Sequence, residues 1–305
     1  MRFVVTGGAG FIGSYIVKLL IEKKYDVAVI DNLHTGNKKN LQSVLDKIDF
    51  YETDIREYEK ISKIIQKSDG IFHQAALTSV PESFEIPEEY YDVNVKGTEN
   101  IFNIAKEQNL KVVYASSSSV YGNVTKIPIH EDSPRNPINP YGKTKLDDEI
   151  LANTFSSNGT QIIGLRYFNV YGIGQTGSYA GVITKFLQNL SKNEPPRIFG
   201  DGSQIRDFIH VSDIANANLS VMNSSITSGF FNVGTGKTIS IQKLADIMIT
   251  LYDLKLTPIH ENSLPGDIEK SQADTQKLQK LIDWKYDIQI HDGLKKIIND
   301  DSSQQ

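Results

Sequence analysis

A glycine-rich segment near the start of the chain limits its possible folds more than any other feature. Gly7, Gly10 and Gly13 follow one another at intervals of three residues. An apolar run at residues 2–5 precedes them, and apolar residues at spacings of three and four follow over residues 11–20. This order predicts a strand, a tight turn and the start of a helix. Such a turn lets a pyrophosphate approach the backbone, and the helix N-terminus offers it free N–H groups.

The second predicted strand, residues 26–30, ends at the acidic residue Asp31. An acidic side chain about 20 residues beyond the glycines is placed to accept hydrogen bonds from a ribose. Because a carboxylate there repels a 2′-phosphate, NAD is favoured over NADP. A glycine turn that only packs a helix on a sheet is the alternative. The complete unit of strand, turn, helix, strand and acid favours dinucleotide binding over it.

Predicted strands and helices alternate through residues 1–168, which is typical of a doubly wound parallel α/β sheet, the Rossmann fold. We expect these residues to form an NAD-binding domain to which residues 209–234 return. The pattern then changes, and residues 169–208 and 235–301 are predicted to form a smaller, discontinuous α/β domain that binds the substrate. Residues 302–305 are expected to be a disordered tail.

The composition excludes several classes of protein. The 305-residue chain has a net charge of −5 and no cysteine, so it lacks both a general basic field for nucleic acid and a disulfide or thiolate framework. Its six histidines are scattered without metal-ligand spacing. No segment reaches the ~20 apolar residues of a membrane span. We therefore expect a soluble, cytoplasmic protein with no metal, nucleic acid or membrane as partner.

Tyr141 and Lys145 are four residues apart at the start of a predicted helix, so their side chains share a face. A tyrosine, with an ordinary pKa of ~10, is a poor base at neutral pH unless a nearby cation stabilises its phenolate. The serines at 116–119 end a predicted strand upstream, where a hydroxyl can hydrogen-bond a substrate oxygen. A surface tyrosine beside a solvated lysine is the alternative, and the serine cluster favours the catalytic interpretation.

These motifs follow one another in a specific order along nearly the whole chain. They are Gly7-x-x-Gly10-x-x-Gly13, Asp31, Asp54-Ile55, His73-Gln74-Ala75-Ala76, residues 116–122, Tyr141-x-x-x-Lys145, residues 165–172, Gly200-Asp201-Gly202 and Arg206-Asp207-Phe208. In this order the chain resembles the extended short-chain dehydrogenase/reductase family. Within it the chain is most similar to the NAD-dependent nucleotide-sugar epimerases, above all the UDP-glucose and UDP-N-acetylglucosamine 4-epimerases. The resemblance implies NAD as cofactor, a UDP-sugar as substrate, and inversion at C4 through a 4-keto sugar.

The resemblance also implies roles for individual residues. Tyr141 would be the catalytic acid and base, Lys145 its charged partner, and Ser117 the serine that hydrogen-bonds the substrate. NAD would be bound by Gly7, Gly10, Phe11, Ile12, Gly13, Asp31, Asn32, Asp54, Ile55, Gln74, Ala75, Ala76, Asn94, Tyr141, Lys145 and Tyr167. The UDP-sugar would be bound by Thr78, Ser79, Ser117, Ser118, Tyr141, Asn169, Val182, Phe199, Arg206, Asp267 and Ser271.

Two positions separate epimerases from other members of this family. Related 4,6-dehydratases carry Asp-Glu directly after the hydroxyl residue, whereas this chain has Ser118 and Ser119. The glutamate of the decarboxylases is also missing from this neighbourhood, so the resemblance implies epimerisation without elimination. Epimerisation of another UDP-sugar such as UDP-glucuronate, and net reduction of a 4-keto sugar, are alternatives. A non-catalytic NAD-sensing protein is a third, but such proteins typically lose the tyrosine or lysine that this chain keeps.

The sugar is predicted from the neighbourhood of Asp267. In the similar 4-epimerases a tyrosine four residues later restricts the substrate to glucose and galactose, and a small residue admits an N-acetyl group. Ser271 is small, and residues 73–81 resemble the UDP-N-acetylglucosamine version, so N-acetylhexosamines are favoured, with UDP-glucose and UDP-galactose as further candidates. Leu264 replaces a common diphosphate-binding arginine. Either Lys270 or another cation substitutes for that arginine, or the diphosphate is held more weakly.

Three helical segments complete the expectations. The sequence predicts a short helix over residues 37–48, a long amphipathic helix over 88–108 and a helix over 141–156. Relatives pair the last two segments in a four-helix interface. The resemblance therefore implies a homodimer.

Overall fold

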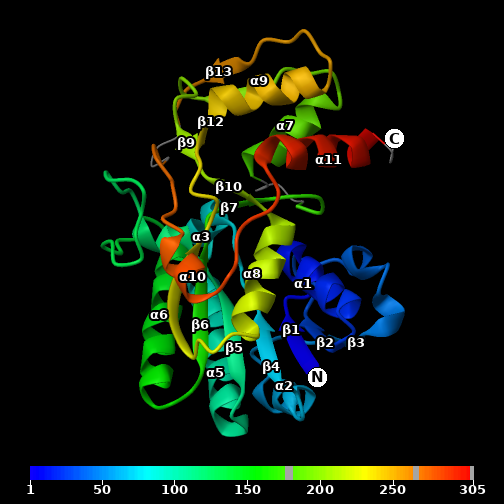
Figure 1. Cartoon of the computed structure of the whole chain (residues 1–305), viewed down its shortest axis with the longest axis vertical. Coiled ribbons are helices and arrows are strands. Elements are labelled where there is room, and N and C mark those ends of the chain that lie inside the picture. Colours follow the sequence, from blue (N-terminus) through cyan, green and yellow to red (C-terminus); the bar gives the residue numbers. More distant parts are fainter. Residues whose placement is uncertain (176–180, 264–267, 303–305) are drawn as a thin grey trace.

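The computed structural model describes residues 1–175, 181–263 and 268–302. Its centre is a seven-stranded parallel sheet in the order β11-β6-β5-β4-β1-β2-β3 (Figure 1). The strands are β1 (Arg2–Thr6), β2 (Asp26–Asp31), β3 (Asp49–Glu52), β4 (Gly70–His73), β5 (Lys111–Ser117), β6 (Ile162–Tyr167) and β11 (Ser228–Val233). The strand order reverses between β1 and β4, which is the switch point where doubly wound sheets bind ligands. The predicted Rossmann fold is confirmed.

Helices cover both faces of this sheet. They are α1 (Phe11–Glu22), α2 (Tyr58–Ile65), α5 (Gly97–Gln108), α6 (Pro140–Ser157), α8 (Val211–Met222) and α10 (Gln276–Leu281). Two short helices, α3 (Val80–Glu85) and α4 (Pro87–Tyr90), contact α6 instead. Because strand residues alternate between faces, Phe3 and Val5 pack in one core cluster with α1 and α8. Val4 between them packs in a second cluster with α2, α5 and α6. The sheet is therefore buried on both sides.

One helix prediction is wrong and another needs refinement. Residues 37–48 form two 3₁₀ turns, η1 (Lys38–Leu41) and η2 (Leu45–Lys47), instead of one helix. Leu41 at the end of η1 and Val44 between the two turns are buried, whereas η2 itself buries no residue. Isolated buried residues in place of a continuous apolar face suit 3₁₀ turns, which rarely exceed three or four residues. The helix expected over 88–108 is a run of α4, the π-helical η3 (Tyr91–Lys96) and α5.

A smaller part of the molecule stands above the carboxyl ends of the sheet strands (Figure 1). Its helices α7 (Val182–Leu190), α9 (Ile241–Leu251) and α11 (Ile290–Ser302) share an apolar core. Three strand pairs complete it: β7 (Asn169–Tyr171) with β10 (Phe208–His210), β9 (Ile205–Arg206) with β12 (Ile239–Ser240), and β8 (Arg197–Phe199) with β13 (Ile259–Glu261). Of the expected tail, Ser302 is the last residue of α11, and residues 303–305 lie outside the described residues.

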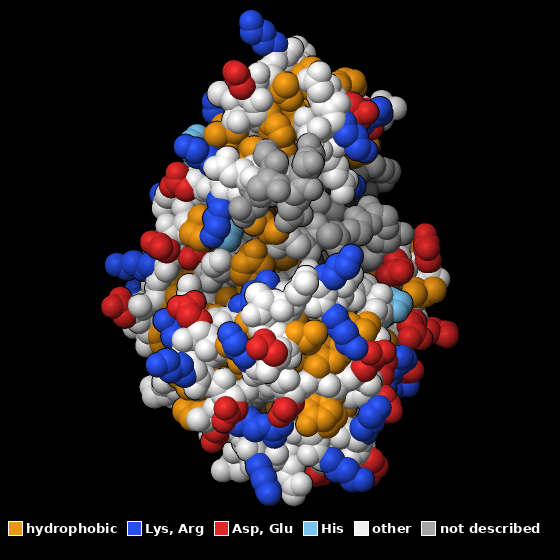
Figure 2. Space-filling view, turned by 90° about the vertical axis from the view of Figure 1, so that its right-hand side faces the viewer, with side chains coloured by type: hydrophobic (Ala, Val, Ile, Leu, Met, Phe, Trp, Pro, Cys, Tyr) orange, Lys and Arg blue, Asp and Glu red, His pale blue; other side chains and the backbone are white. Residues whose placement is uncertain are grey.

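Two further properties concern possible membrane spans and the distribution of surface charge. In the part of the chain that the structure describes, no helix combines the length and the apolar character needed to cross a membrane. Figure 2 shows Lys and Arg side chains interspersed with Asp and Glu over one face of the molecule, with hydrophobic side chains between them. Charges of both signs are therefore mixed on that face.

Candidate active site

The glycine turn forms a tight cradle between β1 and α1. Gly7 has a φ of +66°, and a Cβ atom there would lie 2.6 Å from the backbone nitrogen of Ala75. A Cβ atom on Gly13 would lie 2.1 Å from the backbone oxygen of Gly7. Both positions exclude a side chain because the backbone packs closely there: Gly7 lies against the segment after β4, and Gly13 lets α1 approach the turn, as in a dinucleotide-binding turn. The other turn residues predicted to bind NAD stand at the start of α1: its cap Gly10 and its first residues Phe11 and Ile12.

Asp31 ends β2 and is only 6% exposed. Its Oδ2 accepts a hydrogen bond from the Ala9 N–H at 2.9 Å, and its Oδ1 accepts one from the Leu33 N–H at 2.8 Å. Burial raises the pKa of Asp31, and these two backbone hydrogen bonds oppose the rise. They fix the carboxylate beside the glycine turn while leaving lone pairs to accept from a ribose.

Asn32, Asp54 and Ile55 extend this edge of the site. Asp54 Oδ2 accepts hydrogen bonds from Asn32 Nδ2 and from Arg56 Nη2, both at 2.9 Å. Partial burial acts to raise the pKa of Asp54, but the hydrogen bonds from Arg56 outweigh it and lower the pKa. Ile55 is buried in the core, where its side chain fills the space beside Gly97. The carboxylate of Asp54 is thus held ionised at the end of β3.

His73 ends β4 between two threonine hydroxyls. Its Nδ1 lies 2.6 Å from Thr6 Oγ1, and its Nε2 lies 2.9 Å from Thr98 Oγ1. Complete burial lowers the pKa of His73 to about 3, and the charge of Lys145 adds to the effect. The imidazole is therefore neutral at physiological pH and ties β4 to β1 and α5.

Gln74 and Tyr167, both predicted to bind NAD, meet across the sheet. Tyr167 donates a hydrogen bond to Gln74 Oε1 at 3.2 Å and accepts one from Asn218 Nδ2 at 2.7 Å. Asn218 is fully buried on α8, and nothing in its local sequence marked it in advance. Ala75 and Ala76 follow Gln74 and are half-buried. Their small side chains leave the strand end open to a ligand.

Asn94 is buried in η3, and its side-chain amide makes hydrogen bonds to other residues of the protein. Its Oδ1 accepts from the Leu77 N–H at 2.8 Å, and its Nδ2 donates to the Leu77 carbonyl at 3.0 Å and to Thr144 Oγ1 at 3.0 Å. These contacts connect the segment after β4 to α6. The predicted contact of Asn94 with NAD stays a prediction.

The serine turn and the start of α6 pack against each other. Ser117 ends β5 and caps the 3₁₀ turn η4 (Ser118–Tyr121), where its Oγ accepts from the Ser119 N–H at 3.1 Å. A Cβ atom on Gly142 would lie 2.8 Å from the Ser119 carbonyl oxygen. Tyr141, the residue before that glycine, therefore lies in the first turn of α6 at the serine end of β5. The fold brings together these elements, which are far apart in the sequence.

Lys145 lies one turn further along α6 and is almost fully buried. Its Nζ donates to Asp148 Oδ2 at 3.2 Å, and the Asp148 side chain is 0% exposed. Burial raises the pKa of Asp148 to about 7, although the nearby Lys145 charge opposes the rise. Asp148 was not among the site residues predicted from the sequence, although its position three residues after Lys145 places both on one face of the helix.

A second buried charge on α6 anchors the helix to the sheet. Glu149 accepts from Arg166 Nε and Nη2, each at 2.7 Å, and from Ser116 Oγ at 2.7 Å. Arg135 Nη1 donates to the same carboxylate at 3.0 Å. Arg166 also donates to the Tyr121 hydroxyl at 2.6 Å. This network fixes α6, and with it the tyrosine and lysine, against β5 and β6.

The residues predicted to bind the sugar and its nucleotide border the junction of the two parts. Asn169 Nδ2 donates to the Asp207 carbonyl at 3.0 Å, which joins β7 to the segment before β10. Thr78 is exposed, Ser79 caps α3, and Val182 is the first residue of α7. Outside the described residues lie Leu264 and Asp267.

Ser271 runs beside β9. Its N–H donates to the Ile205 carbonyl at 3.1 Å, next to Arg206, and it is 7% exposed. Lys270 directly before it is exposed, and successive residues of an extended chain point to opposite faces. Ser271 is therefore directed inward and Lys270 outward.

Phe199 lines a surface pocket together with one neighbouring segment. The pocket is formed by Phe199 at the end of β8 and by residues 260–263, which include the end of β13. His260 Nδ1 lies 2.8 Å from the Gly200 carbonyl oxygen, which fixes this edge. An aromatic ring beside polar groups suits a planar, polar base.

Both the sequence and the fold match known proteins. The sequence model of the NAD dependent epimerase/dehydratase family matches residues 3–234. The chain belongs to this family. The closely packed glycine turn between β1 and α1 and the buried carboxylate of Asp31 fit NAD, the cofactor of the family.

Individual relatives of this epimerase match nearly the full length of the chain. The UDP-glucose 4-epimerase of Lactobacillus helveticus is 35% identical over 306 residues, covering 93% of this chain and 92% of the relative. A structure of UDP-N-acetylglucosamine 4-epimerase from Methanobrevibacter ruminantium M1, in complex with UDP-N-acetylmuramic acid, matches with a TM-score of 0.95, 36% identity and coverage of 100% and 99%. The UDP-glucose 4-epimerase of Thermotoga maritima with UDP-glucose gives a TM-score of 0.95, 32% identity and the same coverage. The predictions of an NAD-dependent epimerase and of the extended short-chain dehydrogenase/reductase family are confirmed.

The geometry of Asp31 gives a prediction for this epimerase. Replacing Asp31 with asparagine should lower the preference for NAD over NADP by about fivefold or more, because a charge–charge repulsion at ~4 Å is worth ~1–4 kcal/mol. Dissociation constants of both dinucleotides measure the ratio. Asp26→Asn, at the exposed start of the same strand, is the matched control and should leave it unchanged. An unaltered ratio in Asp31→Asn would refute the role of the carboxylate.

Proposed function

We propose that this protein is a UDP-sugar 4-epimerase that interconverts UDP-N-acetylglucosamine and UDP-N-acetylgalactosamine, with UDP-glucose and UDP-galactose as further substrates. The observation that carries the proposal is the packing of the Tyr141 end of α6 against the serine turn after β5. Lys145 stands buried one turn behind it. This arrangement supplies a proton-transferring hydroxyl, a cation and a hydrogen-bonding serine at the carboxyl end of β5, on one side of the switch point of the sheet.

The chain's own residues divide the work of C4 inversion. Tyr141 removes the proton from the C4 hydroxyl and later returns it, and Ser117 Oγ hydrogen-bonds the same oxygen. Lys145 stabilises the phenolate of Tyr141 by its positive charge. NAD, when bound, supplies a hydride acceptor and donor at C4. Because the hydride is returned to the sugar, no cofactor is consumed.

We assign the UDP moiety to the smaller part of the molecule. We propose that residues 1–168 and 209–234 bind NAD, and that residues 169–208 and 235–301 bind the UDP-sugar. Pairing of β11 with β6 supports the first assignment, and the pocket at Phe199 supports the second as a place for uracil. Arg206 would take the diphosphate. Lys270 is a poor substitute for the arginine that Leu264 replaces, because its side chain points away from the Ser271 face.

The N-acetyl sugar is favoured by the small, inward-directed side chain of Ser271. A serine leaves room where the similar hexose-restricted epimerases carry a tyrosine. The Methanobrevibacter ruminantium structure is of an enzyme named for UDP-N-acetylglucosamine, which supports the same choice. The Lactobacillus helveticus and Thermotoga maritima enzymes are named for UDP-glucose, and they support the hexose as a second substrate.

Replacing Ser271 with tyrosine should separate the two substrates. We expect kcat/KM for UDP-N-acetylglucosamine to fall by about 10–200-fold, the range for a pocket contact of this kind, while UDP-glucose is still used. Ser271→Ala keeps the space and should keep both activities. Equal losses for both sugars in the tyrosine variant would contradict a pocket at this position.

The function is tested by incubating the purified protein with UDP-N-acetylglucosamine and, separately, with UDP-glucose, and resolving the products. The expected result is a 4-epimer from the first and a slower one from the second. Absence of a 4-epimer from both would refute the proposal. A product from UDP-glucuronate alone would favour a different sugar, and stoichiometric consumption of NADH or NADPH would indicate a reductase.

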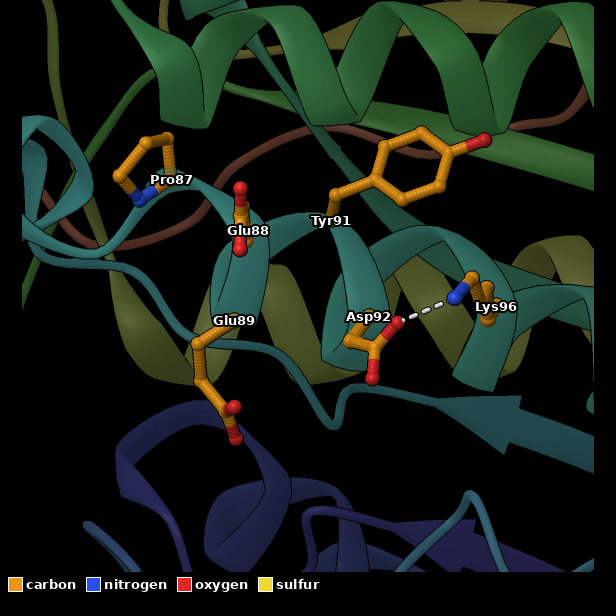
Figure 3. A pocket seen from close by; sticks show the side chains of 6 residues that line it. All are labelled: Pro87, Glu88, Glu89, Tyr91, Asp92 and Lys96. Carbon is orange, nitrogen blue, oxygen red and sulfur yellow. Dashed lines mark ion pairs between the residues drawn. The ribbon is translucent and has the colours of Figure 1, made fainter.

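We also propose a homodimer through η3, α5 and α6. Large apolar side chains are exposed on the adjoining surface: Phe84 by 61%, Tyr91 by 47% and Ile150 by 53%. Figure 3 shows a pocket here, with the ion pair between Asp92 and Lys96 at one end of it. Helices α3, α4 and η3 all contact α6, so the three exposed side chains lie on neighbouring elements. A light-scattering mass equal to one chain would contradict the dimer.

A further inference from the structure

One face of α6 carries four residues in a row, of which one is acidic, two have proposed catalytic roles and one is apolar. Tyr141, Lys145, Asp148 and Ala152 follow at spacings of four, three and four, which places them along one face of the helix. Ala152 belongs to the apolar core, and Asp148 is 0% exposed. An acidic side chain therefore stands where an amphipathic helix would place an apolar one.

Asp148 interacts with Lys145 and leaves half of its carboxylate unused. Oδ2 accepts from Lys145 Nζ at 3.2 Å, and Oδ1 has no hydrogen-bond partner among the described residues. A buried ion pair gains little net stability, because removing two charges from water offsets their attraction. The incomplete hydrogen bonding makes this pair a poor stabilising device. Its position next to the catalytic lysine points instead to a role in the reaction.

The other ionisable groups around the pair leave Asp148 as the counter-charge of Lys145. On the same helix, Glu149 is engaged by two arginines, and Asp147 is paired with Lys143 near the surface. From β5, the Tyr114 hydroxyl is buried and its pKa is raised first by burial, then by the acids of α6. From β4, the neutral imidazole of His73 carries no charge that could compensate the lysine.

We propose that Asp148 is a positioning residue that holds the Lys145 ammonium in the buried row and limits how strongly its charge acts on Tyr141. The inference rests on the proposed roles of Tyr141 and Lys145. When Asp148 is ionised, its negative charge partly cancels the stabilisation that Lys145 gives to the Tyr141 phenolate. When Asp148 is protonated, the full positive charge of the lysine acts on the tyrosine. Because burial raises the pKa of Asp148 to about 7, Asp148 changes between its ionised and protonated forms within the working pH range.

The test is the pH profile of kcat for the NAD-loaded enzyme with a UDP-sugar. Asp148→Asn keeps the size and one hydrogen-bond acceptor but removes the charge. We expect the acid limb of the profile to move to lower pH, by about one unit if the wild-type limb lies above pH 7, where Asp148 is ionised, and by less if it lies lower. Asp147→Asn, one residue away and paired with Lys143, is the matched control and should leave the limb in place. Superimposable profiles of wild type and Asp148→Asn, or a shift to higher pH, would overturn the proposal.

A second measurement needs no turnover. The phenolate of Tyr141 is followed by ultraviolet difference absorbance between each protein and its Tyr141→Phe counterpart, in wild type, Asp148→Asn and Asp148→Ala backgrounds. The pH at which half of Tyr141 is in the phenolate form should fall by about one unit in both Asp148 variants. An unchanged midpoint in the variants that fold would refute the role of Asp148. Since this signal requires no substrate, failure of the proposed function and failure of the inference can be told apart.

Discussion

Replacing Tyr141 with phenylalanine is expected to lower kcat by about 10²–10⁴-fold, the contribution of a positioned acid–base group. In the proposed mechanism this hydroxyl takes and returns the proton of the C4 hydroxyl, and phenylalanine has no such group. The ring itself packs against Leu77, Tyr90 and Val93, so the variant should fold normally. NAD should remain bound, because the glycine cradle and Asp31 are untouched. Initial rates with a UDP-sugar and the absorbance of bound dinucleotide measure the two effects.

Tyr91→Phe is the matched control for this loss. Tyr91 lies on η3 and is 47% exposed, so removal of its hydroxyl should leave kcat unchanged. Wild-type activity in Tyr141→Phe would contradict the proton-transfer role. Loss of NAD together with activity would show that the tyrosine acts in binding rather than in chemistry.

Replacing Glu149 with glutamine is expected to lower the free energy of unfolding by about 3–5 kcal/mol, the usual cost of removing one partner from a buried ion pair. The Glu149 side chain is 0% exposed and accepts both arms of the Arg166 guanidinium. Glutamine can accept with only one oxygen, so the Arg166 charge stays buried without its partner. Equilibrium unfolding in urea, followed by circular dichroism, gives the difference.

An exposed ion pair provides the control for this effect. Lys38 donates to Glu52 at 2.9 Å, and the Glu52 side chain is 57% exposed. Glu52→Gln should change the free energy of unfolding by less than about 1 kcal/mol, as is typical of surface pairs. Similar losses in Glu149→Gln and Glu52→Gln would mean that the buried network does not anchor α6.

The parts of this structure that were predictable from sequence are those encoded locally. The glycine spacing, the acid at Asp31 and the four-residue step from Tyr141 to Lys145 each depend on one strand, turn or helix. Motif order then predicted the family, because no single motif was specific enough. The 3₁₀ turns over residues 37–48 were missed, since short apolar segments carry too few periods to separate a repeat of 3.0 from one of 3.6.

The remaining site residues depend on contacts between distant segments. Asn218 reaches Tyr167 only because α8 packs on the sheet, and Arg135 reaches Glu149 from a loop. Asp148 was overlooked for a different reason. From the sequence alone, a charged residue at this position is expected on a solvated face of the helix. Only the packing of α6 shows that Asp148 is buried.

The most direct test of C4 inversion uses UDP-N-acetylglucosamine that carries deuterium at C4. If the enzyme removes the C4 hydride and returns it within one site, the product is UDP-N-acetylgalactosamine that retains deuterium at C4, with no net accumulation of reduced cofactor. Mass spectrometry and proton NMR of the separated products read both the label and the configuration. Loss of deuterium from the 4-epimer, or recovery of the substrate alone with no 4-epimer, would contradict the account.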